Sequence, residues 1–228
     1  MRSLNWKPAK PPERRALEGS LVRLEPVDPD RHGVALFTSS EAAPEIWTHL
    51  AYGPFPNQAV FTSWLEDRAA TEDPLFYAIV DRASGSAHGM ASFLRMDPQN
   101  GVIEIGHIWF APELQRTRQA TEAIYLLASH AFDDLGYRRL EWKCDSLNGP
   151  SRRAAERFGF IYEGVFRQHM VVKGRNRDTA WFSILDSEWP TICSAFEAWL
   201  APGNFDADGR QRQSLAAIRE SIARDSAS

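Results

Sequence analysis

The chain has 228 residues, a formal net charge of −4 and a composition that is 43% hydrophobic and 25% charged. This length suffices for one substantial core, and the Lys and Arg residues are spread along the chain without a basic patch or tail. We therefore expect one main domain and no nucleic acid as partner, and no membrane either, since no apolar run reaches spanning length.

The first part of the chain predicts an arm, a strand and two helices. Residues 1–20 hold three prolines that favour an extended arm, with Trp6 as an apolar anchor, lying across its own domain or a partner subunit. LVRLEPV alternates as a strand, and Asp28 to Ser40 indicates a helix entered through Pro29. An aromatic loop and a second helix follow. Their aromatic residues, with one from a later strand, favour the core over an acceptor pocket: Trp47, Tyr52, Phe55, Trp64 and Phe166.

Two strand–turn–helix units occupy the middle of the chain. GVIEIGHIWF (101–110) is apolar on both faces, which is typical of a central strand, and a helix ending near Gly136 follows it. RRLEWKCD (138–145) alternates strictly between apolar and charged residues, and a second helix is expected to start at Ser151 as its N-cap. Two such units in succession indicate a mixed α/β fold that holds a ligand between diverging strand ends.

Hairpins and helices complete the predicted elements. Residues 82–86 join one pair of strands, and residues 174–177 join the last pair. The closing region predicts a helix with Ile192, Phe196 and Trp199, and then a short polar helix at best from Ser214 to Arg224.

Cysteine usage points to a reducing compartment. Cys144 and Cys193 lie in a predicted strand and a predicted helix without the spacing of metal ligands, so we expect reduced thiols and no metal site. The polar start MRSLNWKPAK does not suit a signal peptide. A cytoplasmic location is therefore expected.

The turn of the first strand–turn–helix unit has the features of an anion site. A helix that opens directly after a strand presents unpaired backbone N–H groups and the positive end of its dipole. We therefore expect a phosphorylated cofactor at this turn.

At this point the residues themselves match a known pattern. The order EIGHIWF, QRTRQATEA, NGPSRRAAERFGF and EGVFRQHMVVKGRNRDTAWFSILDSEW resembles the GNAT acetyltransferase superfamily, in particular its RimJ/RimL-like branch, over roughly Leu21 to Trp189. The resemblance implies an α/β fold with a mixed, mostly antiparallel central sheet flanked by helices and a splay between the fourth and fifth strands. It also implies acetyl-CoA as cofactor.

The resemblance assigns the cofactor to three segments. In the family, a turn of pattern Gln/Arg-x-x-Gly-x-Gly/Ala cradles the pyrophosphate. Here Arg118 stands at the usual glycine position. Its side chain is expected either to point outward or to touch the phosphates. Amides of the splayed strand bind pantetheine unless they pair normally in the sheet, and an asparagine after the next strand helps to hold it. The implied cofactor-binding residues are Ile108, Trp109, Phe110, Gln115, Arg116, Thr117, Arg118, Gln119, Ala120, Thr121, Asn148 and Ser151.

Three residues are candidates for catalysis. Glu104 and His107 lie on the strand that meets the cofactor turn, and either can take the proton of the attacking amine, directly or through water. An ordinary histidine pKa suits a base, whereas Glu104 requires desolvation, but the resembling enzymes often carry glutamate there, so Glu104 is preferred. The structural alternatives are an ion pair with an arginine for Glu104 and a hydrogen-bonded core histidine for His107.

The leaving thiolate has its own candidate acid. In the RimL-like branch the matching serine is Ser151, for which a plain N-cap is the alternative. Many relatives outside that branch use a tyrosine instead, but that position is Ala155 here. Coenzyme A thiolate is also a fair leaving group, so a dedicated acid is not required.

These observations lead to one main functional interpretation. The chain is expected to be an acetyl-CoA-dependent N-acetyltransferase that acts by direct attack in a ternary complex on a primary amine, either a small molecule or a protein N-terminus. A non-catalytic acyl-CoA-binding sensor and an interaction protein are the alternatives.

The chain divides into three predicted segments. These are an N-terminal extended arm (1–20), an acetyltransferase-like domain (21–190) and a C-terminal helical extension (191–228). A homodimer is expected, with the arm from Trp6 to Glu18 packed against the partner. The charged run Lys173 to Asp178 is either a solvated hairpin tip or a surface that steers an acidic acceptor or the coenzyme phosphates.

Overall fold

The computed structural model describes residues 6–225, so residues 1–5 of the predicted arm and 226–228 of the predicted extension lie outside the described residues. An eight-stranded sheet runs through the molecule in the order β1-β2-β3-β4-β5-β6-β8-β7. Neighbouring strands pair antiparallel, apart from the parallel pair β5 and β6. This confirms the predicted mixed, mostly antiparallel sheet. The strands are β1 Leu17–Glu18, β2 Val22–Pro26, β3 Leu75–Asp81, β4 Ala87–Asp97, β5 Val102–Phe110, β6 Arg139–Asp145, β7 Ile161–Val172 and β8 Arg175–Leu185.

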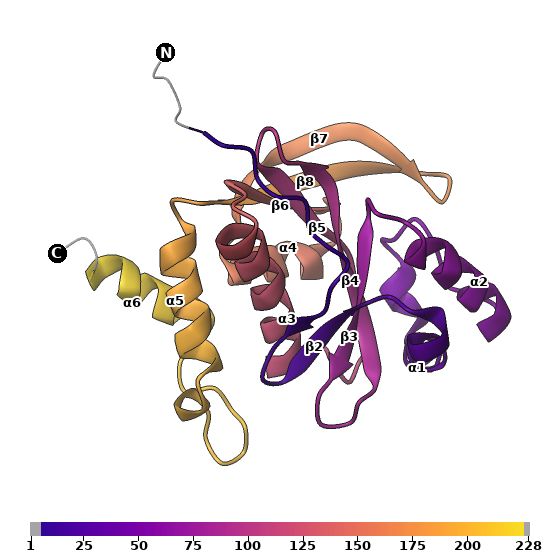
Figure 1. Ribbon diagram of the computed structural model, residues 1–228, viewed down its shortest axis with the longest axis horizontal. Coiled ribbons are helices and arrows are strands. Elements are labelled where there is room, and N and C mark those ends of the chain that lie inside the picture. Colours follow the sequence, from indigo (N-terminus) through magenta and orange to yellow (C-terminus); the bar gives the residue numbers. More distant parts are fainter. Residues whose placement is uncertain (1–5, 226–228) are drawn as a thin grey trace.

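Helices cover both faces of the sheet. Figure 1 shows α1 and α2 on one side of the sheet, α3 and α4 on the other, and α5 and α6 outside α3 and α4. A 3-10 turn follows α1, and a π-helical turn extends α3. The helices and turns are α1 Pro29–Glu41, the 3-10 turn Pro44–Trp47, α2 Gln58–Ala69, α3 Arg118–Ser129, the π-helical turn His130–Asp134, α4 Gly149–Phe158, α5 Trp189–Leu200, the 3-10 turn Pro202–Asn204 and α6 Leu215–Asp225.

Each face of the sheet buries its own apolar cluster. Trp47 is fully buried beneath α1 and α2, with its ring 5.1 Å from that of Trp109 and 5.3 Å from that of Phe55. Tyr52 and Trp64 pack against the same cluster. Four of the five aromatic residues singled out in the sequence thus belong to the core, as their density indicated. The fifth, Phe166, is 54% exposed on β7.

The start of α3 is fixed by a buried carboxylate. Glu122 accepts hydrogen bonds from the backbone N–H groups of Ser20, Leu21 and Val22 at 2.7 to 2.9 Å. These bonds satisfy a charge that would otherwise be costly to bury, and they tie α3 near its N-terminus to the loop before β2 and to the first residue of β2. The helix N-terminus at the predicted anion site is therefore held in place by the sheet.

The N-terminal arm lies across its own domain. Trp6 Nε1 donates to the carbonyl of Gln99 at 2.8 Å, and Ala9 N donates to the carbonyl of Pro98 at 2.9 Å. The Trp6 ring packs so closely on Gly101 that an added Cβ would lie 2.4 Å from it. The arm was predicted to lie either across its own domain or on a partner subunit. In the structure Trp6 anchors it on its own domain.

Several predicted boundaries shift in the structure. The prediction of Ser151 as an N-cap is wrong: Asn148 caps α4, its Oδ1 accepting from Ser151 N at 3.1 Å, because Gly149 and Pro150 already lie in the first helical turn. The last hairpin turns at residues 173–174, since β8 already begins at Arg175. None of the described helices has the length and apolar character needed to cross a membrane.

Candidate active site

The strands β5 and β6 separate at the centre of the sheet. Their parallel pairing ends at Ile105 and Trp142, whereas β5 continues to Phe110 and β6 to Asp145. Without the two-residue β1, these are the fourth and fifth strands, so the predicted splay is present. On the side of β5 that faces away from β4, the backbone beyond Ile105 is left without a strand partner and can bond an extended ligand.

A bulge in β5 brings the two candidate bases to one cavity. The pairing of β4 with β5 shifts between Met90 and Ser92, and His107 has a φ of +51° there. Gly106 gives room beside the bulge, since an added Cβ would lie 2.8 Å from Leu94 Cδ2. Because of the extra residue, Glu104 and His107 line the same cavity although they are three positions apart.

This cavity of about 220 Å³ opens between the splayed strands, the loop after the 3-10 turn and the β7–β8 hairpin. A larger hollow of about 540 Å³ elsewhere is lined by Glu25 and residues that pair with it, so its charges are already matched. The smaller cavity is therefore the candidate active site. Its polar lining residues are His49, Arg95, Glu104, His107, Lys143, Cys144, Asp145, Asn148, Ser151, His169, Arg177 and Thr179.

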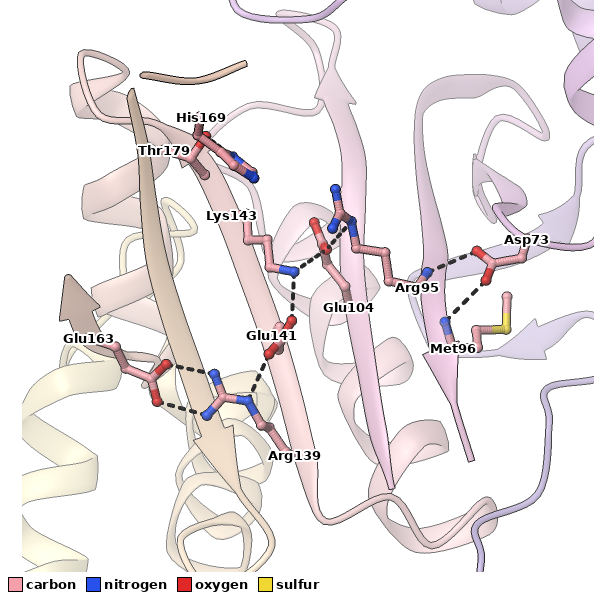
Figure 2. A network of polar contacts seen from close by, with 10 residues as sticks. All are labelled: Asp73, Arg95, Met96, Glu104, Arg139, Glu141, Lys143, Glu163, His169 and Thr179. Atoms are coloured by element: carbon pink, nitrogen blue, oxygen red, sulfur yellow. Dashed lines mark hydrogen bonds and ion pairs between the residues drawn. The ribbon is translucent and has the colours of Figure 1, made fainter. Parts of the chain in front are cut away.

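Glu104 belongs to a chain of charges, in which it lies between Lys143 and Arg95 (Figure 2). Lys143 Nζ lies 2.9 Å from Glu104 and 2.7 Å from Glu141. Glu141 in turn pairs with Arg139, which forms a two-pronged ion pair with Glu163. Burial raises the pKa of Glu104, and the Lys143 ammonium partly offsets that rise.

His107 is held by aromatic neighbours. Its Nδ1 lies 3.0 Å from Tyr52 Oη, and its ring stacks on Tyr52 and tilts against Phe76. Burial, followed by the charges of Arg68 and Arg177, lowers the pKa of His107 to about 4. A base whose conjugate acid is this strong takes a proton from an amine poorly at neutral pH, so the ordinary histidine pKa assumed from the sequence does not apply here.

Ser151 occupies the opposite wall of the cavity. Its Oγ accepts a hydrogen bond from Trp142 Nε1 at 3.0 Å. Burial raises the pKa of Cys144, so that thiol stays protonated at neutral pH. Asn148 uses Oδ1 to cap α4, which leaves its amide N–H groups for a ligand.

The turn from β5 to α3 presents free amides. In the part of the chain that the structure describes, the backbone N–H groups of residues 116–119 have no acceptor. Ala120 N donates to Thr117 Oγ1 at 3.1 Å, so the amide of Ala120 is already satisfied. Four free N–H groups at the N-terminus of a 12-residue helix form the site that a pyrophosphate requires.

Arg118 is compatible with the turn although it replaces a glycine. It is the first residue of α3 and does not have a positive φ, whereas Arg116 does, at +62°. Its guanidinium donates to the carbonyl of Leu200 at 2.9 Å and lies 4.2 Å from the ring centroid of Phe205. Two directions were predicted for this side chain, outward into solvent or toward the phosphates. It takes neither, because it binds the C-terminal segment instead.

Sequence reasoning missed several residues of the cavity. Lys143 appeared to lie on a polar strand face, but its side chain is only 6% exposed because opposite charges surround it. His49 pairs with Asp145 at 3.2 Å, and His169 with Thr179 at 2.9 Å. The first pair joins residues 96 positions apart and the second joins the two strands of the β7–β8 hairpin, so no spacing within a single element signals either of them. Among the described residues, no three His, Cys, Asp or Glu side chains are grouped as for a metal ion.

Comparisons with known proteins agree with this geometry. The model of the acetyltransferase (GNAT) domain matches residues 22–161. A crystal structure of a GCN5-related N-acetyltransferase from Brucella melitensis is 54% identical, with a TM-score of 0.93, covering 95% of this chain and 99% of that one. The protein YdaF of Bacillus subtilis, whose name places it among candidate ribosomal N-acetyltransferases, is 29% identical over 73% of this chain and 90% of its own length.

Two further proteins are similar over part of the chain or in fold. The ribosomal-protein-serine acetyltransferase of Escherichia coli is 32% identical over 44% of this chain and 56% of its own length. The fold is also that of the microcin C7 self-immunity acetyltransferase MccE, solved with acetyl-CoA and AMP, at 23% identity and a TM-score of 0.65 over 73% of this chain and 93% of that one.

The chain belongs to the GNAT acetyltransferase family, and its relatives include proteins named as ribosomal N-acetyltransferases. It is an N-acetyltransferase, and its cofactor is acetyl-CoA. The free amides of residues 116–119 and the unpaired edge of β5 fit the phosphates and the extended arm of this cofactor.

Proposed function

We propose that the chain transfers the acetyl group of acetyl-CoA to a primary amine by direct attack in a ternary complex. The observation that carries this proposal is one cavity that is lined at once by the splayed end of β5, by Glu104 and by Ser151. Bound acetyl-CoA supplies an activated acetyl thioester. Cys144 also lines the cavity, but burial raises its thiol pKa, which disfavours a covalent acyl-cysteine route.

In this proposal Glu104 takes the proton of the attacking amine, directly or through water. Its carboxylate is buried beside the bulge, and burial raises its pKa and hence its basicity. Lys143 keeps that carboxylate ionised and in place. His107, neutral at physiological pH and bonded to Tyr52, holds the cavity wall instead of acting as the base.

Further roles fall to Ser151 and the backbone. Ser151, with its Oγ held by Trp142, is placed to donate a proton to the leaving thiolate. The backbone of residues 108–110 and Asn148 bind the pantetheine arm, and the backbone of residues 115–121 binds the pyrophosphate, chiefly through the free amides of residues 116–119.

The acceptor is a small-molecule amine or a protein N-terminus. Similarity to a ribosomal-protein-serine acetyltransferase over part of the chain supports a protein acceptor. The cavity of about 220 Å³ also has room for a small amine.

An amine panel tests the proposal. Thiol release from acetyl-CoA is measured with amino acids, polyamines and peptides of varied N-terminal residue, for the wild type and for Glu104→Gln. Because the glutamate acts when deprotonated, wild-type kcat/KM rises as the pH increases through the Glu104 pKa, and the variant loses this rise while its affinity for coenzyme A stays unchanged. A Glu104→Gln variant near wild type, beside an inactive His107→Gln variant, would assign the base to His107.

The same panel separates the alternative functions. An acyl-CoA sensor binds coenzyme A in a thermal shift assay but releases no thiol with any amine. A protein that only mediates interactions does neither.

Two broader proposals accompany the activity. We propose a homodimer, although the arm from Trp6 to Glu18 is anchored on its own domain, so the more suitable surface is the edge strand β7 with exposed Ile161, Phe166 and Val171. Light scattering of the full chain at micromolar concentration tests this. We also propose a cytoplasmic location, because Cys144 and Cys193 are both free thiols.

A further inference from the structure

The cavity wall contains three cations that differ in how they are paired. Lys143 lies between Glu104 and Glu141, and Arg95 reaches Glu104 at 3.4 Å (Figure 2). Arg177 has no ion pair and no side-chain hydrogen bond with the described residues. Its Nε atom is buried without a partner. The guanidinium of Arg177 therefore has hydrogen-bond donors that no acceptor among the described residues satisfies.

Arg177 is close to the place of reaction. It lies on β8, paired with Met170 of β7, and lines the cavity together with His169 and Thr179. Burial is the first cause that lowers the pKa values of His107 and His169, and the charge of Arg177 contributes in both cases. The positive charge of Arg177 therefore acts on His107 of β5 and on His169 of β7, which both line the cavity.

The coenzyme does not account for this charge. The free amides suited to its phosphates belong to residues 116–119, which do not line the cavity. The carboxylates of the cavity wall are engaged elsewhere, since Asp145 contacts His49 and Leu147 N, and Glu104 contacts Lys143. A half-buried guanidinium without a counter-charge is costly, and a planar carboxylate matches its fork of N–H donors.

We propose that Arg177 binds a carboxylate carried by the acceptor, so that the substrate is an amine with a carboxylate close to its amino group. This inference rests on the proposed function and narrows its acceptor class. Such a group occurs in a free amino acid and in a peptide with an acidic residue near its N-terminus. The part of Arg177 is to select and orient the acceptor, not to take part in proton transfer.

The test uses pairs of acceptors that differ only in this charge. Free amino acids are compared with their amides, and peptides with Glu at the second position are compared with the Gln counterparts. Thiol release gives kcat and KM for the wild type, Arg177→Gln, Arg177→Lys and the control Arg175→Gln. Arg175 is exposed two residues earlier on β8 and outside the cavity, so the control removes an equal charge from the same strand.

In one of the two kinds of pair, amino acids or peptides, we expect the wild type to prefer the acceptor with the carboxylate. Its kcat/KM should be higher by about tenfold or more, chiefly because its KM is lower. Arg177→Gln should bring this ratio close to one, Arg177→Lys should keep part of it, and Arg175→Gln should keep all of it. A preference among the amino-acid pairs indicates that the acceptor is a free amino acid, and a preference among the peptide pairs indicates an acidic peptide N-terminus.

Three results would overturn the inference. In the first, the wild type uses both members of every pair equally. In the second, Arg177→Gln retains the preference. In the third, Arg177→Gln lowers kcat equally for both members of a pair and leaves KM unchanged. The last result would place Arg177 at the reaction centre. Coenzyme A affinity and melting temperature, measured for each variant, identify any loss of fold.

Failure of the proposed function has a different outcome. If no amine supports thiol release, that function fails, and the inference is then tested by binding alone. Carboxylate ligands should raise the melting temperature of the coenzyme A complex more than their amides do, for the wild type but not for Arg177→Gln. Equal shifts in both proteins would refute the carboxylate site.

Discussion

Proline at position 118 tests the anion site at the level of a single amide. Arg118 is the first residue of α3, where proline is well tolerated because its fixed φ suits the helix. The preceding Thr117 is already extended, with ψ of 168°, as a residue before proline prefers. Arg118→Pro therefore removes one free N–H group and leaves the course of the backbone unchanged.

The expected loss follows from the chemistry of that bond. A hydrogen bond from an amide to a charged phosphate contributes about 1.5–3 kcal/mol, so Arg118→Pro should bind coenzyme A roughly 10- to 100-fold more weakly. The substitution also removes the contact of the guanidinium with Leu200 and Phe205. Arg118→Ala removes only that contact and is the matched control.

Titration calorimetry with coenzyme A measures the difference between the two variants. Dephosphorylated pantetheine, which lacks the pyrophosphate, should bind both of them alike. Equal coenzyme A affinity for Arg118→Pro and Arg118→Ala would refute the role of the amide. Substitution at Ala120 is less informative, because its N–H already bonds to Thr117 and proline there would also disturb the helix cap.

Two further predictions concern pH and the arm. His107 has a pKa of about 4 in the fold and about 6.5 when unfolded, so the unfolded chain binds more protons between these values and stability falls as the pH drops through that window. His107→Asn, which tolerates the positive φ, should remove this slope, on the order of 2 kcal/mol between pH 6.5 and 4 by urea denaturation, and an unchanged slope would count against a buried neutral ring. Trp6→Ala should destabilise the chain by about 1–3 kcal/mol without altering its mass in light scattering, because Trp6 packs on Gly101 of its own domain. A dimer that dissociates in this variant would instead support exchange of the arm.

Local patterns were sufficient to predict most of the fold. The apolar run 101–110 and the alternation at 138–145 gave β5 and β6 to within one residue, and the helix predicted from Asp28 to Ser40 is α1, Pro29–Glu41. These signals lie within one element and follow from side-chain period and cap chemistry. The predicted start of α4 was wrong, because Ser151 and Asn148 are both good caps and only the geometry of the turn decides between them.

The cavity was harder to predict because its residues come from separate elements. The sequence singled out Glu104, but it did not indicate that Lys143 would be buried beside it, since Lys143 fits the charged face of an alternating strand. Its neighbours on that face include Glu104 of β5 and Trp181 of β8, whose ring centroid lies 3.7 Å from Lys143 Nζ, and β8 joins the sheet only after α4. Similarly, the low pKa of His107 depends on burial and on Arg68 and Arg177, which are remote in sequence.

The departure of this chain from the glycine of the cofactor turn is connected with its C-terminal extension. A glycine at position 118 would leave the carbonyl of Leu200 and the ring of Phe205 without their present contact. Both lie beyond residue 161, where the family match ends, and α5 and α6 pack outside α3 and α4 (Figure 1). Since the first residue of the helix needs no positive φ, arginine is accommodated there without backbone strain. The turn thus keeps its free amides, while the Arg118 side chain joins the C-terminal segment to the start of α3, the helix that we propose binds the cofactor.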